Sequence, residues 1–108
     1  MMIDMEEKLK IIIELLIKKT KSRQLVWDQL NKNAYSANFN ENKIVLNNQM
    51  IYFREKKKIS LLIYNAKDEV ITSIDDTKNK DIRKLHQLAH HNYYKFDETI
   101  DMIIQQLI

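Results

Sequence analysis

The stretch ISLLIYNAKDEVITSI, residues 59–74, decides the fold that we expect for this chain. Two runs rich in β-branched and other apolar residues flank a turn-like segment, residues 65–68, and apolar side chains alternate along each run. Both faces of these runs carry apolar residues. Such strands are usually central in a sheet, or are covered on one face by helices and on the other by a second subunit. The stretch therefore predicts a β-hairpin at the centre of an antiparallel sheet.

Length and composition favour one globular domain, residues 1–108, because 44% hydrophobic and 31% charged residues suffice for one core. The chain has no Gly, Pro or Cys. This excludes Gly-rich phosphate loops, disulfides, thiolate nucleophiles and cysteine-type zinc sites. Turns must use Asn and Asp, which best tolerate left-handed backbone after Gly. We expect a cytoplasmic protein without a signal peptide and without a membrane span.

Apolar periodicity and turn residues predict the remaining elements. They are a helix over residues 4–19, strands over 25–30, 35–39 and 43–46, a segment 50–53 that continues the third strand past a bulge or stands alone, and helices over 80–91 and 98–108. Asp4 and Asp97 are the expected N-caps of the first and last helices. The expected fold class is α+β, with an N-terminal helix, a four- to five-stranded antiparallel β-meander, and two C-terminal helices packed on one face of the sheet.

The first predicted helix has more apolar surface than one packing face requires. Ile11 and Leu15 extend its apolar stripe to a second face. Either the helix is wedged between the sheet and a terminal helix, or it forms the seam of a homodimer. With the second face of the hairpin, these residues predict a self-association interface made by Ile11, Leu15, Leu62, Tyr64 and Ile71.

Basic residues are more clustered than a formal net charge of +3 suggests. One group follows the first helix and another precedes the hairpin: Lys19, Lys21, Arg23, Arg54, Lys56, Lys57 and Lys58. Converging groups would bind nucleic acid or a nucleotide-like anionic ligand. Groups that stay apart would form a solvated surface instead.

The sharpest chemical pattern is the pair His86 and His90, one helical turn apart and able to face one metal ion. Gln87 occupies the place of the glutamate in the HExxH motif of zinc hydrolases, and no third ligand is specified nearby. No Ser or Thr lies on a nucleophile elbow. We therefore expect no enzyme, no metal site and no cofactor, and the sequence favours a small interaction module that binds proteins, with self-association.

The order of features resembles small, poorly characterised prokaryotic domains with a Leu-rich first helix, a Trp-bearing first strand, a Tyr-x-Ala second strand, a hairpin and a closing helix pair. The residues that carry the resemblance are Leu15, Leu16, Thr20, Leu25, Trp27, Tyr35, Ala37, Leu61, Ile63, Leu85, Leu88, Ala89 and residues 97–107. Such domains accompany bacterial defence and mobile-element genes. The resemblance thus implies a binding module in phage–host conflict, and it implies no catalytic residue.

Overall fold

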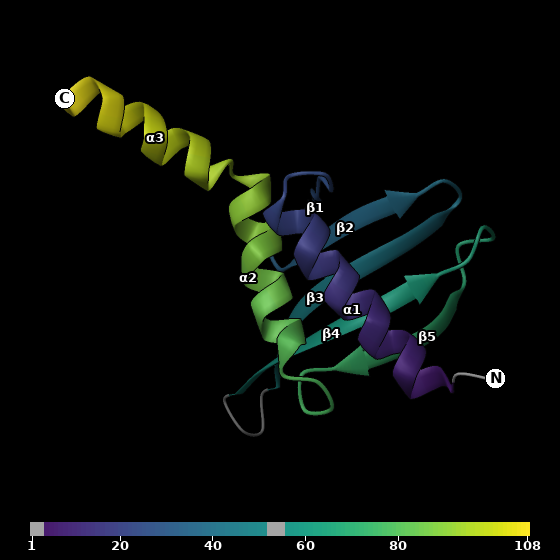
Figure 1. Ribbon diagram of the computed structural model, residues 1–108. Coiled ribbons are helices and arrows are strands. Elements are labelled where there is room, and N and C mark those ends of the chain that lie inside the picture. The colour runs from purple at the N-terminus through teal and green to yellow at the C-terminus, as the bar shows by residue number, and fades with distance from the viewer. Residues whose placement is uncertain (1–3, 52–55) are drawn as a thin grey trace.

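The structure, a computed structural model, describes residues 4–51 and 56–108 and confirms the α+β fold class. Figure 1 shows its elements: α1 (Met5–Lys21), β1 (Asp28–Asn31), β2 (Ala34–Phe39), β3 (Asn42–Ile51), β4 (Lys56–Tyr64), β5 (Val70–Asp75), α2 (Asp81–Tyr93) and α3 (Phe96–Leu107). The strands form one antiparallel sheet in the order β1-β2-β3-β4-β5. Each strand thus pairs with its neighbour in sequence, as in a meander.

The predicted hairpin is present as β4 and β5, with Leu61 opposite Ile74 and Leu62 opposite Ser73. Its predicted position is wrong, because β5 is an edge strand and β3 is the central strand. Of the two alternatives for residues 50–53, continuation of the third strand is confirmed for Met50 and Ile51, but the predicted bulge at residues 47–49 is wrong. β3 instead pairs with β4 without interruption from Lys43 to Ile51, and residues 52 and 53 lie outside the described residues.

Asn and Asp form two of the turns, as the lack of Gly predicts. Asn40 and Asp68 have φ angles of 58° and 64°, and Asp68 closes the hairpin turn by donating its backbone N–H to the carbonyl of Asn65 at 3.0 Å. Two further left-handed residues, Arg23 and Lys95, are neither Asn nor Asp. Both lie at the ends of helices, where a single left-handed residue changes the direction of the chain.

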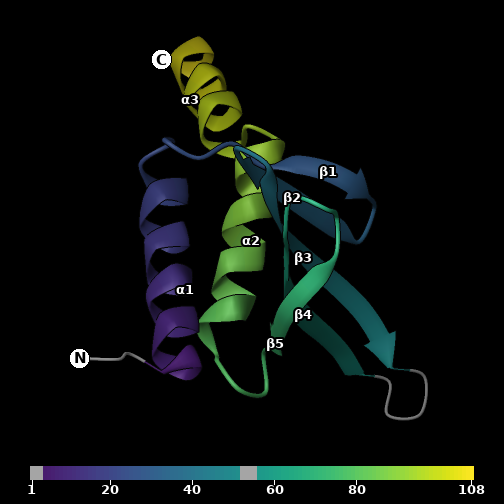
Figure 2. The ribbon, with the colours of Figure 1, turned by 90° about the vertical axis from the view of Figure 1, so that its right-hand side faces the viewer.

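Helices α1 and α2 lie on the same side of the sheet (Figure 2). Asp4 caps α1 as predicted, because its carboxylate accepts the backbone N–H of Glu7 at 2.9 Å. One continuous core joins the helices to the sheet: Ile13, Leu16, Trp27, Tyr35, Ala37, Ile44, Leu46, Ile59, Leu61, Ile82, Leu85 and Ala89. No helix among the described residues combines the length and the apolarity needed to cross a membrane.

Helix α3 does not pack on the sheet, so this detail of the expected arrangement is wrong. It projects away from the other elements (Figure 1), and none of its residues is buried. Lys95, with φ of 52°, stands at its N-cap position and turns the chain away from α2. Asp97, the predicted cap, instead lies in the first turn and faces Arg23 at 3.8 Å. The radius of gyration, 15.4 Å, exceeds the about 13 Å of a compact chain of this length.

Candidate functional site

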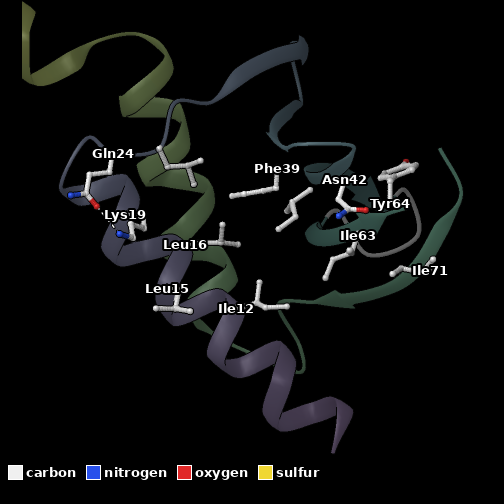
Figure 3. A pocket seen from close by; sticks show the side chains of 12 residues that line it. Ile12, Leu15, Leu16, Lys19, Gln24, Phe39, Asn42, Ile63, Tyr64 and Ile71 are labelled. Carbon is white, nitrogen blue, oxygen red and sulfur yellow. Dashed lines mark hydrogen bonds between the residues drawn. The ribbon is translucent and has the colours of Figure 1, made fainter. Parts of the chain in front are cut away.

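An apolar groove of about 610 Å³ runs between α1 and the helix side of the sheet. Figure 3 shows that α1 forms one wall and the ends of β2 to β5 form the other. Twelve side chains line it: Ile12, Leu15, Leu16, Lys19, Gln24, Leu25, Phe39, Asn42, Ile44, Ile63, Tyr64 and Ile71. Lys19 is the one charged residue among them, and its ammonium group donates to the Gln24 side chain at 2.8 Å.

The groove exists because two helices do not cover the helix side of a five-stranded sheet. Ile13 and Leu16 of α1 are buried in the core shared with α2. Leu16 also lines the groove, together with its neighbours Ile12 and Leu15, and Leu15 remains 50% exposed. The over-wide apolar stripe of α1 is therefore divided between the core and the groove.

A β-bulge brings Ile71 into the groove. Ile63 pairs with Thr72, but the next residue, Tyr64, pairs with Val70, so Ile71 has no partner in the register. A bulge of this kind redirects a side chain, and Ile71, 61% exposed, lines the groove beside Ile63. The prediction that Ile71 shares a face with Leu62 is wrong, because strict alternation does not allow for an extra residue.

The structure brings together three of the five predicted interface residues. Leu15, Tyr64 and Ile71 line the groove. Leu62, half-buried, pairs with Val45 and Ser73 on the face of the sheet that faces away from the groove. Ile11, 40% exposed, belongs to α1 but does not line the groove.

Phe39 and Asn42 are among the lining residues that the sequence patterns did not predict. The two residues pair across the β2–β3 turn, and this turn places both at the groove. A signal for Phe39 was available, because it follows Tyr35 and Ala37 at alternate positions and therefore faces the helices. Phe39 is 37% exposed at the end of that row.

The predicted basic groups do not converge among the described residues. Lys19 lies at the groove, and Arg23 faces Asp97 and Glu98 of α3 at 3.8 and 3.7 Å. Lys84 lowers the pKa of Lys21 through a side-chain hydrogen bond and charge repulsion. Lys19, Lys21 and Arg23 therefore lie at the C-terminal end of α1 or in the connection after it.

Lys58, the member of the second basic group whose side chain the structure describes, lies near the opposite end of α1, about 25 Å along a helix of 17 residues. Lys58 pairs with Asp75 at 3.1 Å and lines a polar hollow together with Glu6 and Glu7. Lys56 and Lys57 belong to β4, and Arg54 lies outside the described residues. Lys58 is therefore separate from Lys19, Lys21 and Arg23, and it is paired with Asp75.

Asp75 gives a prediction for acid unfolding. The Thr77 hydroxyl and Lys58 hold the pKa of Asp75 at about 2, below its usual 3.8. The ionised carboxylate thus stabilises the fold above pH 3.8, and this stability is lost as the pH falls towards 2. Asp75→Asn should lower the free energy of unfolding by about 1–2 kcal/mol at pH 7 and flatten its decline between pH 4 and 2. Urea unfolding at several pH values measures both effects.

Asp28→Asn is the matched control for that variant, because Asp28 is exposed at the start of β1. It removes one negative charge without touching Lys58 or Thr77. Equal pH profiles for the two variants would contradict the role assigned to Asp75.

His86 and His90, the predicted pair, pack around Tyr35. Its ring centroid lies 5.4 Å from that of His86 and 5.7 Å from that of His90, and its hydroxyl shares a hydrogen bond with Nδ1 of His90. Burial lowers the pKa of His86. In the part of the chain that the structure describes, no three His, Cys, Asp or Glu side chains are grouped to hold a metal ion. His86 and His90 therefore pack against β2 through the ring of Tyr35.

Comparison of the chain with protein-family models, with curated proteins and with solved structures finds no match. A functional conclusion therefore depends on the surfaces described above. Among the surfaces of the described residues, the groove combines a volume of about 610 Å³ with a mainly apolar lining.

Proposed function

We propose that this chain is a small non-enzymatic interaction module that self-associates, and that the apolar groove beside α1 is its contact surface. The observation that carries the proposal is the groove itself, with exposed Leu15 and Ile71 on opposite walls. Apolar residues left in water at such a site favour a partner that covers them.

The lining chemistry favours a protein partner over a small polar ligand. Sites for polar ligands present several convergent polar groups, whereas the polar lining here consists of Lys19, Gln24 and Asn42, with Tyr64 contributing one hydroxyl. Lys19 and Gln24 already bond to each other. Apolar grooves accept the apolar face of an amphipathic helix.

The aromatic residues at the groove support the same proposal. Phe39 and Tyr64 line it from β2 and β4, and Tyr64 also holds the Lys43 ammonium 4.7 Å from its ring centre. Aromatic side chains are enriched among the residues that contribute most to protein interfaces. The resemblance to domains near defence genes makes phage–host conflict the proposed setting.

Leu15→Glu tests the proposal. We expect the wild-type chain to self-associate at tens of micromolar, and we expect the variant to dissociate about 10- to 100-fold more readily, as for the loss of one buried leucine. Sedimentation equilibrium measures both dissociation constants. Val26→Glu is the control, because Val26 is 70% exposed but does not line the groove.

Two results would contradict the proposal. A wild-type chain that is strictly monomeric at these concentrations would rule out self-association. An equal loss from Val26→Glu and Leu15→Glu would show that the groove is not the contact surface.

A further inference from the structure

Helix α3 is an amphipathic helix whose apolar face has no cover among the described residues. The face consists of Ile100, Ile103, Ile104, Leu107 and Ile108, which are 41% to 97% exposed. An isolated helix of 12 residues is only marginally stable in water, and most helices in proteins depend on packing of their apolar face. α3 therefore needs a surface to pack against.

We propose that α3 of one copy occupies the groove of a second copy, and that the second copy returns its own α3 to the first. This inference rests on the proposed function and names the segment that fills the groove. Because each copy supplies one helix and one groove, the exchange closes as a twofold dimer and leaves neither surface open.

The position of the groove fits a helix. It lies on the helix side of the sheet next to α1, where a third helix would complete the layer. Its walls are Ile12 and Leu15 on α1 and Ile63 and Ile71 on the sheet. The exposed face of α3 consists of the same kind of aliphatic side chain.

The path of the chain favours a second copy over the chain's own α3. Figure 1 shows that α3 leaves the end of α2 and points away from α1 and the sheet. Left-handed Lys95 sets this direction, and the ring of Phe96 stacks on His91 with centroids 4.6 Å apart. Arg23 faces the first turn of α3. To enter its own groove, α3 would have to reverse at Lys95 and lose these contacts.

The charges that remain on the two surfaces are of opposite sign, because Asp97 and Glu98 face Arg23 of their own chain, which leaves Asp101 of α3 to meet Lys19 of the groove. α3 contains the acidic residues Asp97, Glu98 and Asp101 and no Lys or Arg, so the rest of the chain has all 18 basic residues and the other 12 of 15 acidic ones. The one charged residue of the groove is Lys19. An anionic membrane is a poorer cover for α3, because helices that lie on membranes carry Lys and Arg on their polar face.

Cross-linking between single-cysteine variants of the full chain tests the exchange, since the chain has no cysteine of its own. Leu15→Cys marks the groove, Ile104→Cys marks the apolar face of α3, and Gln105→Cys marks its polar side. With a short bis-maleimide, a mixture of Leu15→Cys and Ile104→Cys should form covalent dimers at least tenfold faster than a mixture of Leu15→Cys and Gln105→Cys. Cooperative urea unfolding of each variant verifies that it is folded.

Each other outcome overturns the exchange. Faster cross-linking of Ile104→Cys to itself than to Leu15→Cys would show pairing of α3 with α3. A cross-link within one chain of a Leu15→Cys/Ile104→Cys double variant would show α3 in its own groove. Flotation of the wild-type chain with vesicles of phosphatidylcholine and phosphatidylglycerol, lost in Ile104→Asp, would make a membrane the cover.

The sedimentation experiment separates this inference from the proposed function. Equal cross-linking rates for Ile104→Cys and Gln105→Cys, in a protein whose dimer depends on Leu15, would overturn the exchange and leave the groove as the interface. A monomeric wild-type chain would overturn both.

Discussion

Trp27→Ala should lower the free energy of unfolding by about 3–5 kcal/mol, the usual cost of truncating a large buried aromatic side chain. Trp27 is 1% exposed and belongs to the core shared by α1, α2 and the sheet. Its indole N–H donates to the Thr20 hydroxyl at 2.9 Å, and that hydroxyl donates to the carbonyl of Leu16 at 2.7 Å. The substitution therefore removes packing and a buried hydrogen-bond donor together. Because Trp27 is the single tryptophan, unfolding must be followed by far-UV circular dichroism.

Two changes at Thr20 isolate the hydrogen bond from the packing. Thr20→Val keeps the volume but leaves the indole N–H without its acceptor, and should cost about 1–3 kcal/mol. Thr20→Ser keeps the hydroxyl and loses one methyl group, so it should retain the hydrogen bond to Trp27. If Thr20→Ser destabilised the fold as much as Thr20→Val, the hydrogen bond would not be the cause.

Trp27 also affects the groove, because it anchors the connection between α1 and β1. Residues 22–27 form this connection, and Gln24 and Leu25 within it line the groove. Loss of the Trp27 side chain should leave Gln24 and Leu25 less firmly positioned at the groove. A Trp27→Phe variant that stays folded should therefore self-associate more weakly than the wild type.

The strand pairing and the core of the helices could be predicted from the sequence because they follow local periodicity. Alternation in residues 59–74 predicts that Leu61 and Ile63 share one face and that Thr72 and Ile74 share one face, and the register does pair Leu61 with Ile74 and Ile63 with Thr72. The period of α2 places Ile82, Leu85 and Ala89 on one face, and all three are buried. In both cases each residue's environment depends on neighbours at fixed spacing.

The groove depends on features that have no such local signal. One is the bulge that redirects Ile71. The flanking residues Val70 and Thr72 are equally compatible with a regular strand, so the sequence does not mark the extra residue. Another is the number of helices that reach the sheet. The periodicity of α3 shows that its face needs a cover, but does not say which surface covers it.

The direction of α3 depends on one residue that carried no signal. Lys95 adopts the left-handed conformation, which a lysine normally avoids and which Gly or Asn would have indicated. The capping preference of Asp and the apolar periodicity of residues 98–108 predict a cap at Asp97 and a helix packed on the sheet. The backbone at Lys95 ends α2 and separates α3 from the domain.

Asn92→Ala should lower the free energy of unfolding by about 2–3 kcal/mol. Asn92 lies in the last turn of α2, and its amide bridges two backbone groups of the connection after α1. Its side-chain oxygen accepts the N–H of Trp27 at 2.9 Å, and its side-chain nitrogen donates to the carbonyl of Leu25 at 3.0 Å. Both backbone groups are part-buried, so removal of the amide leaves a donor and an acceptor unpaired at the same time.

Gln87→Ala is the matched control, because it removes an exposed amide from the same helix. It should be neutral or slightly stabilising, since alanine favours helix. Asn92 joins the end of α2, from which α3 departs, to Leu25 at the groove. Asn92→Ala should therefore also weaken self-association in sedimentation equilibrium, while Gln87→Ala leaves it unchanged. Equal urea midpoints for the two variants would show that the bridge from Asn92 to Leu25 and Trp27 does not hold the groove wall in place.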